Sequence, residues 1–93
     1  MTPDEIQRAI TLGQRAKAIL ADELVVECRK MVKAELLDAF VRTAPSDNEG
    51  RERIYNMLKM HDRVWEHLEK VLSDGKVADS MLPVEQRRGL LTF

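Results

Sequence analysis

The sequence has few of the residues that mark disulfide-linked, sheet-rich or membrane proteins. It contains one cysteine, four glycines and three prolines, and aromatic residues make up only 4% of the chain. A single cysteine excludes an internal disulfide. No apolar run is long enough for a signal peptide or a membrane span. These absences predict a protein of a reducing, cytoplasmic compartment that has no membrane partner.

The charges are abundant but balanced. Fifteen basic and sixteen acidic residues give a formal net charge of −1, so no overall field attracts the chain to nucleic acid or anionic lipid. The high charged fraction, 33%, and the five methionines are typical of helices packed by aliphatic side chains. A chain of 93 residues allows one domain, near the size at which a single core becomes marginal and oligomerisation helps.

The stretch from Ser46 to Gly75 predicts an amphipathic helix over about residues 47–74. Ser46 and Glu49 have the three-residue spacing of a capping box, and Gly75 suits the left-handed position that ends a helix. Apolar residues and one histidine recur every three or four positions: Ile54, Met57, Leu58, His61, Val64, Trp65, Leu68, Val71 and Leu72. One face of this helix therefore needs a partner.

The first half of the chain predicts a second long helix. Thr2 is a good N-cap, and Pro3 suits the first helical position. Because no proline follows until Pro45, the preferred interpretation is one continuous helix over about residues 3–43. The alternative is a break at Asp22, whose side chain can cap a second helix over residues 23–41.

The linker between the two predicted helices, residues 42–45, is short enough to make them antiparallel neighbours. The predicted fold class is therefore all-α: a long antiparallel helical hairpin over residues 1–75, oligomerising, with an irregular tail over 76–93 that holds at most a short helix. The first 15 or so residues would overhang the shorter second helix. Their small residues, such as Gly13 and Ala16, are expected to contact another subunit or the returning tail.

The chain shows no constellation that supports catalysis. His61 and His67 are six residues apart, whereas a helical metal pair needs a spacing of three or four. Cys28 has no base placed beside it by the sequence, and no nucleotide-binding or nucleophile motif occurs. We predict no catalytic residue, metal or cofactor, and no enzymatic activity. His61 is expected to be hydrogen-bonded in the apolar seam, His67 to be solvated, and Cys28 to be a small buried residue.

Two sets of residues are candidates for contacts with partners. The expected oligomer interface consists of apolar and small positions on both helices: Ile10, Gly13, Leu20, Leu24, Val64, Trp65 and Leu68. The candidate nucleic-acid contacts are basic: Arg8, Arg15, Lys17, Arg51 and Arg53. In a ring of subunits these charges would repeat and multiply the phosphate contacts. The alternative is an ordinary solvated surface, because no set of stacking aromatic residues accompanies them.

Four segments carry a resemblance to a known group of proteins: NEGRER at 48–53, MLK at 57–59, VWEHL at 64–68 and GKVA at 75–78. With these segments the chain resembles short helical proteins of tailed bacteriophages, from head-assembly and DNA-packaging gene neighbourhoods, over roughly residues 36–78. Small terminase subunits, which form rings around a helical-hairpin core and present viral DNA to a motor, look like one member of that neighbourhood.

The resemblance implies a non-enzymatic phage assembly or DNA-packaging component that acts as a homo-oligomer, including a small-terminase-like ring that binds DNA. Its partners would be DNA and other phage packaging or head proteins, in the cytoplasm of an infected cell or in the virion. The chain departs from small terminases because no helix-turn-helix module precedes the hairpin and no space remains for a strand-rich terminal domain. The alternative function is a small regulatory binding protein that acts on a host or viral protein.

Overall fold

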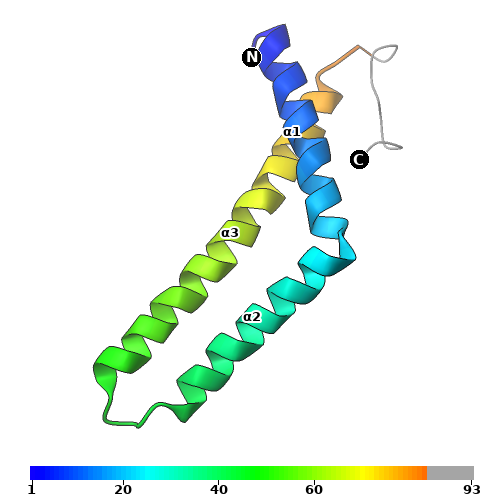
Figure 1. Cartoon of the computed structure of the whole chain (residues 1–93). Helices are drawn as coiled ribbons and strands as arrows, with labels where there is room; N and C mark the ends of the chain where they lie inside the picture. Colours follow the sequence, from blue (N-terminus) through cyan, green and yellow to red (C-terminus); the bar gives the residue numbers. More distant parts are fainter. Residues whose placement is uncertain (84–93) are drawn as a thin grey trace. The chain divides into compact units, whose positions relative to one another are not determined.

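The computed structural model describes residues 1–83, and in that range it is helical without strands. The helices are α1 (Pro3–Ala21), α2 (Glu23–Arg42) and α3 (Asn48–Ser80) (Figure 1). The predicted all-α class is confirmed. Most of the predicted irregular tail, from residue 84 onward, lies outside the described residues.

The chain forms two compact units. One consists of Met1–Asp22 with residues 67–83, and the other is Glu23–Glu66. Helix α3 is continuous through both units, whereas the boundary between α1 and α2 falls at Asp22. The predicted hairpin therefore corresponds to α2 and the first part of α3, and α1 belongs to the other unit.

The preferred prediction of one continuous helix over residues 3–43 is wrong, and the alternative of a break at Asp22 is confirmed. Asp22 has an extended backbone, with φ −66° and ψ 124°, and its N–H donates to the carbonyl oxygen of Ile19 at 3.2 Å. Aspartate favours such a position because its short polar side chain competes with helical hydrogen bonding. The start of α1 follows the prediction: Thr2 Oγ1 accepts from the backbone N–H of Glu5 at 3.2 Å.

The first turn of α3 is capped one residue later than the sequence pattern suggested. Asp47 Oδ1 accepts a hydrogen bond from the backbone N–H of Gly50 at 2.9 Å, and the Asp47 carbonyl accepts from Arg51 N–H. A Cβ atom at position 50 would run into the Asp47 carboxylate, so glycine leaves room for the cap. Asp47, and not the predicted Ser46, is therefore the N-cap.

Replacing Asp47 by alanine is expected to destabilise the hairpin by about 1 kcal/mol, because the N–H of Gly50 loses its acceptor. The measurement is the free energy of unfolding from urea titrations followed by circular dichroism. Ser46→Ala serves as the matched control, because it removes the predicted capping hydroxyl next door and is expected to change little. A larger loss for Ser46→Ala than for Asp47→Ala would contradict the assignment of the cap.

Helix α3 does not end at Gly75 as predicted but runs on to Ser80, over 33 residues in all. Gly75 is buried inside the helix. A glycine in a helix interior costs about 1 kcal/mol relative to alanine. Tertiary packing overrides that cost here, which a pattern of local signals does not reveal.

The core of the first unit lies where α1 meets the last turns of α3 (Figure 1). On α1 the buried residues are Ile10, Gly13 and Ala16, and on α3 they are Gly75, Ala78 and Asp79. Most of these side chains are small, so the two backbones can approach closely. The start of α1 therefore finds its partner within the chain, in the unpredicted extension of α3.

The second unit is a two-helix hairpin. Thr43–Asp47 form the connection, in which the N–H of Asp47 donates to the carbonyl of Ala44 at 2.9 Å, with Pro45 inside the turn. Among the residues of α2 none is fully buried, and the side chains that meet α3 are half-buried. Two helices alone do not enclose a core, so much of their apolar surface stays open to solvent.

Candidate functional site

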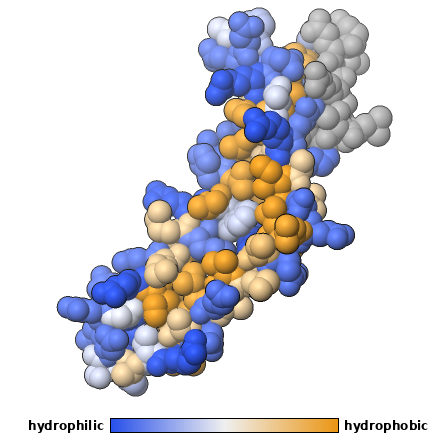
Figure 2. Space-filling view, viewed as in Figure 1, coloured by the Kyte–Doolittle hydropathy of each residue, from blue (hydrophilic) through white to orange (hydrophobic). Residues whose placement is uncertain are grey.

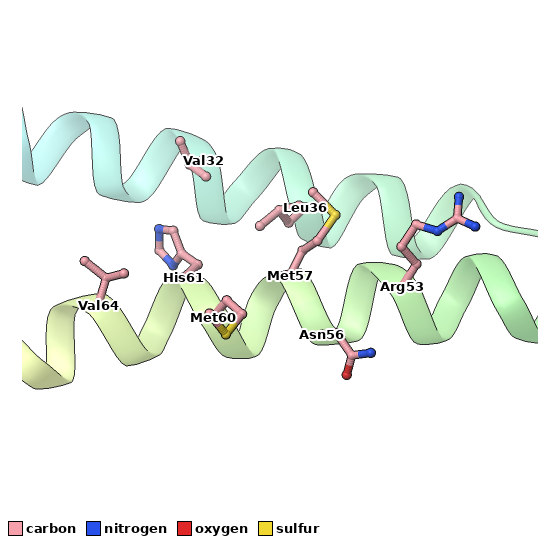
Figure 3. Close-up of a pocket in the computed structure, with 8 residues that line it drawn as sticks. All are labelled: Val32, Leu36, Arg53, Asn56, Met57, Met60, His61 and Val64. Atoms are coloured by element: carbon pink, nitrogen blue, oxygen red, sulfur yellow. The ribbon is translucent and has the colours of Figure 1, made fainter.

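The main feature of the hairpin is an open apolar groove along one of its faces, with a volume of about 580 Å³. Its lining residues come from both helices: Val32, Leu36, Arg53, Asn56, Met57, Met60, His61 and Val64. Figure 3 shows Met57 and His61 of α3 pointing toward α2, where Val32 and Leu36 lie. Hydrophobic side chains also run along the hairpin in the space-filling view of Figure 2.

The helical repeat explains why these residues share one face. Met57, Met60 and Val64 are spaced by three and four residues, so they lie in a row on α3. Val32 and Leu36 are one turn apart on α2. Met57, Met60 and Val64 are apolar, yet all three side chains are exposed. The groove is therefore a surface that a partner could cover.

Polar and aromatic contacts close the opposite side of the hairpin. Asp62 lies about 140° round α3 from Met57, at 100° per residue. Lys33 Nζ is 3.3 Å from Asp62 Oδ1. The guanidinium of Arg29 lies over the ring of Trp65, 5.1 Å from its centroid. These cross-helix contacts cover one side only.

A third cross-helix contact lies nearer the turn, where Arg51 is 4.8 Å from the ring centroid of Phe40. Together the three contacts join α2 to α3 along most of the hairpin. Each is partly exposed, so solvent screens it and its contribution to stability is small. They align the two helices, but they do not replace the burial of apolar surface that a closed core would provide.

His61 links the groove to the polar side of the hairpin. Trp65 Nε1–H donates to His61 Nε2 at 3.3 Å, and His61 Nδ1 lies 3.3 Å from Asp62 Oδ1. Because a tryptophan N–H can only donate, Nε2 must be unprotonated and the proton sits on Nδ1, where it is donated to the carboxylate. The predicted hydrogen-bonded histidine is confirmed, and its neighbours hold it in one orientation. His67 is exposed, as expected.

The pKa of Asp62 lies below its ordinary value of 3.8, first because His61 donates a hydrogen bond to the carboxylate and then because Lys33 attracts it. The ionised form is thus favoured in the folded state. Its contribution to stability is complete above the unfolded pKa and is lost as the pH falls through the lower folded pKa.

We therefore expect wild-type stability to fall more steeply than that of Asp62→Asn when the pH is lowered from about 5 to about 2. The measurement is the urea midpoint of unfolding at each pH for both proteins. Asp74→Asn is the control, because Asp74 pairs at 3.2 Å with Lys70 of its own helix. Parallel pH profiles for wild type and Asp62→Asn would argue against the contribution of this carboxylate.

The residues predicted at an oligomer interface fall into different environments. Ile10 and Gly13 are buried within the single chain and leave no surface for a second copy. Leu20, Trp65 and Leu68 are half-buried, and only Leu24 and Val64 are exposed. Of the residues that line the groove, the predicted interface included only Val64, although the apolar periodicity of both helices was visible in the sequence.

The predicted nucleic-acid contacts are divided between the two units. Arg8, Arg15 and Lys17 lie on α1 in the first unit, where Arg8 and Arg15 share a shallow polar depression with Asp4. Arg51 and Arg53 lie on α3 in the second unit. Arg51 covers the ring of Phe40, and Arg53 lines the apolar groove. Within neither unit do these side chains form a large basic patch.

Cys28 is exposed, so the prediction of a buried cysteine is wrong. The sequence pattern placed it on an apolar stripe, but α2 has too few partners to cover that stripe. Among residues 1–83, no three His, Cys, Asp or Glu side chains are grouped closely enough to hold a metal ion. In the same range no helix has the length and hydrophobicity to span a bilayer.

Comparison of the chain with protein-family models, with curated proteins and with solved structures finds no match.

Proposed function

We propose that this chain is a non-enzymatic phage assembly or DNA-packaging component that acts as a homo-oligomer. The observation that carries the proposal is the hairpin without a core: α2 has no fully buried residue, and apolar side chains of both helices are exposed. A surface of this kind is typical of a chain that completes its packing against a partner.

The energies involved favour association. Covering a valine, leucine or methionine side chain contributes about 1.5–3 kcal/mol. The groove exposes Val32, Met57, Met60 and Val64. In proteins most of the stability of a helix comes from the tertiary packing of its apolar face. A partner that covers the groove would therefore stabilise both the complex and the hairpin itself.

The phage role is supported by the sequence segments at 48–53, 57–59, 64–68 and 75–78. Most of these segments lie in the hairpin, the same part of the chain that leaves its apolar surface open. DNA binding, if it accompanies assembly, would use Arg8, Arg15, Lys17, Arg51 and Arg53, repeated from subunit to subunit. Such contacts with phosphates weaken steeply as salt rises.

The first test is the absolute mass of the protein by light scattering after size exclusion, at low and at high salt. A mass of two or more chains that persists at high salt is expected, because apolar contacts are not screened. A monomer at all accessible concentrations would contradict the proposal. It would favour instead the small binding protein that acts on a host or viral protein.

The second test separates DNA packaging from assembly without DNA. Binding of a labelled duplex is followed by fluorescence anisotropy as salt is raised. Packaging predicts an affinity that falls steeply with salt and is weakened further by the Arg8→Glu and Arg15→Glu substitutions. An oligomer without affinity for the duplex would restrict the role to head assembly.

A further inference from the structure

We propose that His61 makes the contact between α2 and α3 sensitive to pH, because the neutral imidazole accepts a hydrogen bond from Trp65 that the protonated ring cannot accept. The proposal concerns the hairpin itself, so it does not depend on the proposed function or on any partner of the chain. It rests on the position of His61 among the polar contacts of the hairpin.

Two of the cross-helix contacts end on the hydrogen-bond partners of His61. Lys33 of α2 is paired with Asp62 at 3.3 Å. Arg29 of α2 lies over the ring of Trp65, 5.1 Å from its centroid. His61 Nδ1 lies 3.3 Å from Asp62 Oδ1, and His61 Nε2 accepts from Trp65 Nε1–H at 3.3 Å. The imidazole therefore joins one cross-helix contact to the other.

The ring of His61 has little freedom to exchange these partners for water. Its side chain is only 9% exposed. It meets the indole of Trp65 edge to face, with ring centroids 6.1 Å apart and ring planes that cross at 62°. Figure 3 shows the imidazole pointing toward α2. A change in the hydrogen bonding of this ring must therefore move the ring or its neighbour.

A second proton on the imidazole removes the acceptor of Trp65. Histidine is the side chain that ordinarily changes charge between about pH 5 and about pH 8. When Nε2 of His61 takes a proton from solvent, both ring nitrogens donate and neither accepts. The indole nitrogen of Trp65 can also only donate, so two N–H groups would face each other across 3.3 Å. The hydrogen bond is then lost, and one of the two rings has to turn.

The charges around His61 decide which ring turns. Within the hairpin, the charged side chains that contact His61 or its two partners are Asp62 of α3 and Arg29 and Lys33 of α2. The imidazolium is held by Asp62, because a hydrogen bond between two charged groups is stronger than one between neutral groups. Trp65 is therefore the side chain expected to turn. Its contact with Arg29 is then lost, while Lys33 stays paired with Asp62.

The first experiment follows two ring contacts of the wild-type chain by NMR at about pH 8 and at about pH 5. Nuclear Overhauser contacts between the Trp65 ring and the Arg29 side chain are expected at the higher pH and are expected to be lost at the lower. Contacts between Phe40 and Arg51, whose guanidinium is 4.8 Å from the ring centroid, should persist at both. They are the internal control, because among the described residues no hydrogen bond joins a histidine to this pair.

Two variants identify the histidine responsible. Trp65 is the only tryptophan in the sequence, so its indole N–H resonance is followed in a titration over the same pH range. His61→Gln is expected to abolish the movement of this resonance, because the glutamine carbonyl accepts from Trp65 and its amide donates to Asp62 at every pH. His67→Gln is the matched control, because His67 is exposed on the same helix, and the transition should remain.

Three results would overturn the proposal. Equal contacts between Trp65 and Arg29 at both pH values would mean that protonation leaves this pair in place. Simultaneous loss of the contacts between Phe40 and Arg51 would mean that the hairpin unfolds as a whole. A transition of the Trp65 resonance that survives in His61→Gln would assign it to another group. The first two results come from the wild-type chain, so they decide the proposal even if His61→Gln does not fold.

Discussion

Replacing Leu24 by aspartate is expected to dissociate the oligomer, with a loss of affinity of about 100-fold or more. Leu24 is 72% exposed in the single chain and lies on α2 in the same row as Cys28 and Val32. A carboxylate introduced there would have to leave water when a second copy covers the face. Light scattering over a range of concentrations measures the effect.

Leu37→Asp is the matched control for this substitution. Leu37 is also on α2 and 47% exposed, but it does not line the groove and belongs to another side of the helix. It is expected to leave the mass of the oligomer unchanged. Equal dissociation by Leu37→Asp would mean that general weakening of α2, and not a covered face, explains the result.

Replacing Ile10 by alanine is expected to destabilise the first unit by about 2–4 kcal/mol, from the lost burial and the cavity left behind. Ile10 has no exposed surface and is the largest fully buried side chain among the described residues. A loss of this size is a large part of the stability of a small protein. Urea unfolding followed by circular dichroism gives the free energy directly.

The control for this prediction is Ile19→Ala, because Ile19 is in the same helix and is 40% exposed. The loss of stability for Ile19→Ala should be a fraction of the loss for Ile10→Ala. The comparison also tests whether Ile10 belongs to the predicted interface between copies. If Ile10→Ala left stability intact but reduced the oligomer, Ile10 would belong to a contact between copies after all.

Much of the local structure was predictable from neighbouring residues. Thr2 and Pro3 identified the start of α1 correctly, because capping depends on groups within one turn. The apolar spacing of residues 54–72 indicated the amphipathic helix that α3 forms there, although none of these residues is fully buried. The break at Asp22 was visible only as an alternative, because the same aspartate is also tolerated on an exposed helix surface.

The errors have a common physical origin. Gly75 looked like a helix end because glycine usually costs stability inside a helix, and Cys28 looked buried because it follows an apolar stripe. Gly75 is buried where α3 packs in the first unit, so tertiary packing outweighs the local cost of glycine there. Cys28 is exposed, because the packing of α2 leaves that part of its apolar stripe uncovered. Neither the burial of Gly75 nor the exposure of Cys28 is determined by the residues next to it in the sequence.

Local information was enough to show that the chain is helical, where most helices begin, and that its apolar surface exceeds what two helices can bury. Those properties follow from capping groups, from the 3.6-residue repeat and from composition. Which apolar residues are covered depended on the packing: Ile10 is enclosed within the chain, whereas Met57, Met60 and Val64 stay exposed. That choice depends on which faces meet across distant segments, because burial is a property of the packed helices and not of any single one.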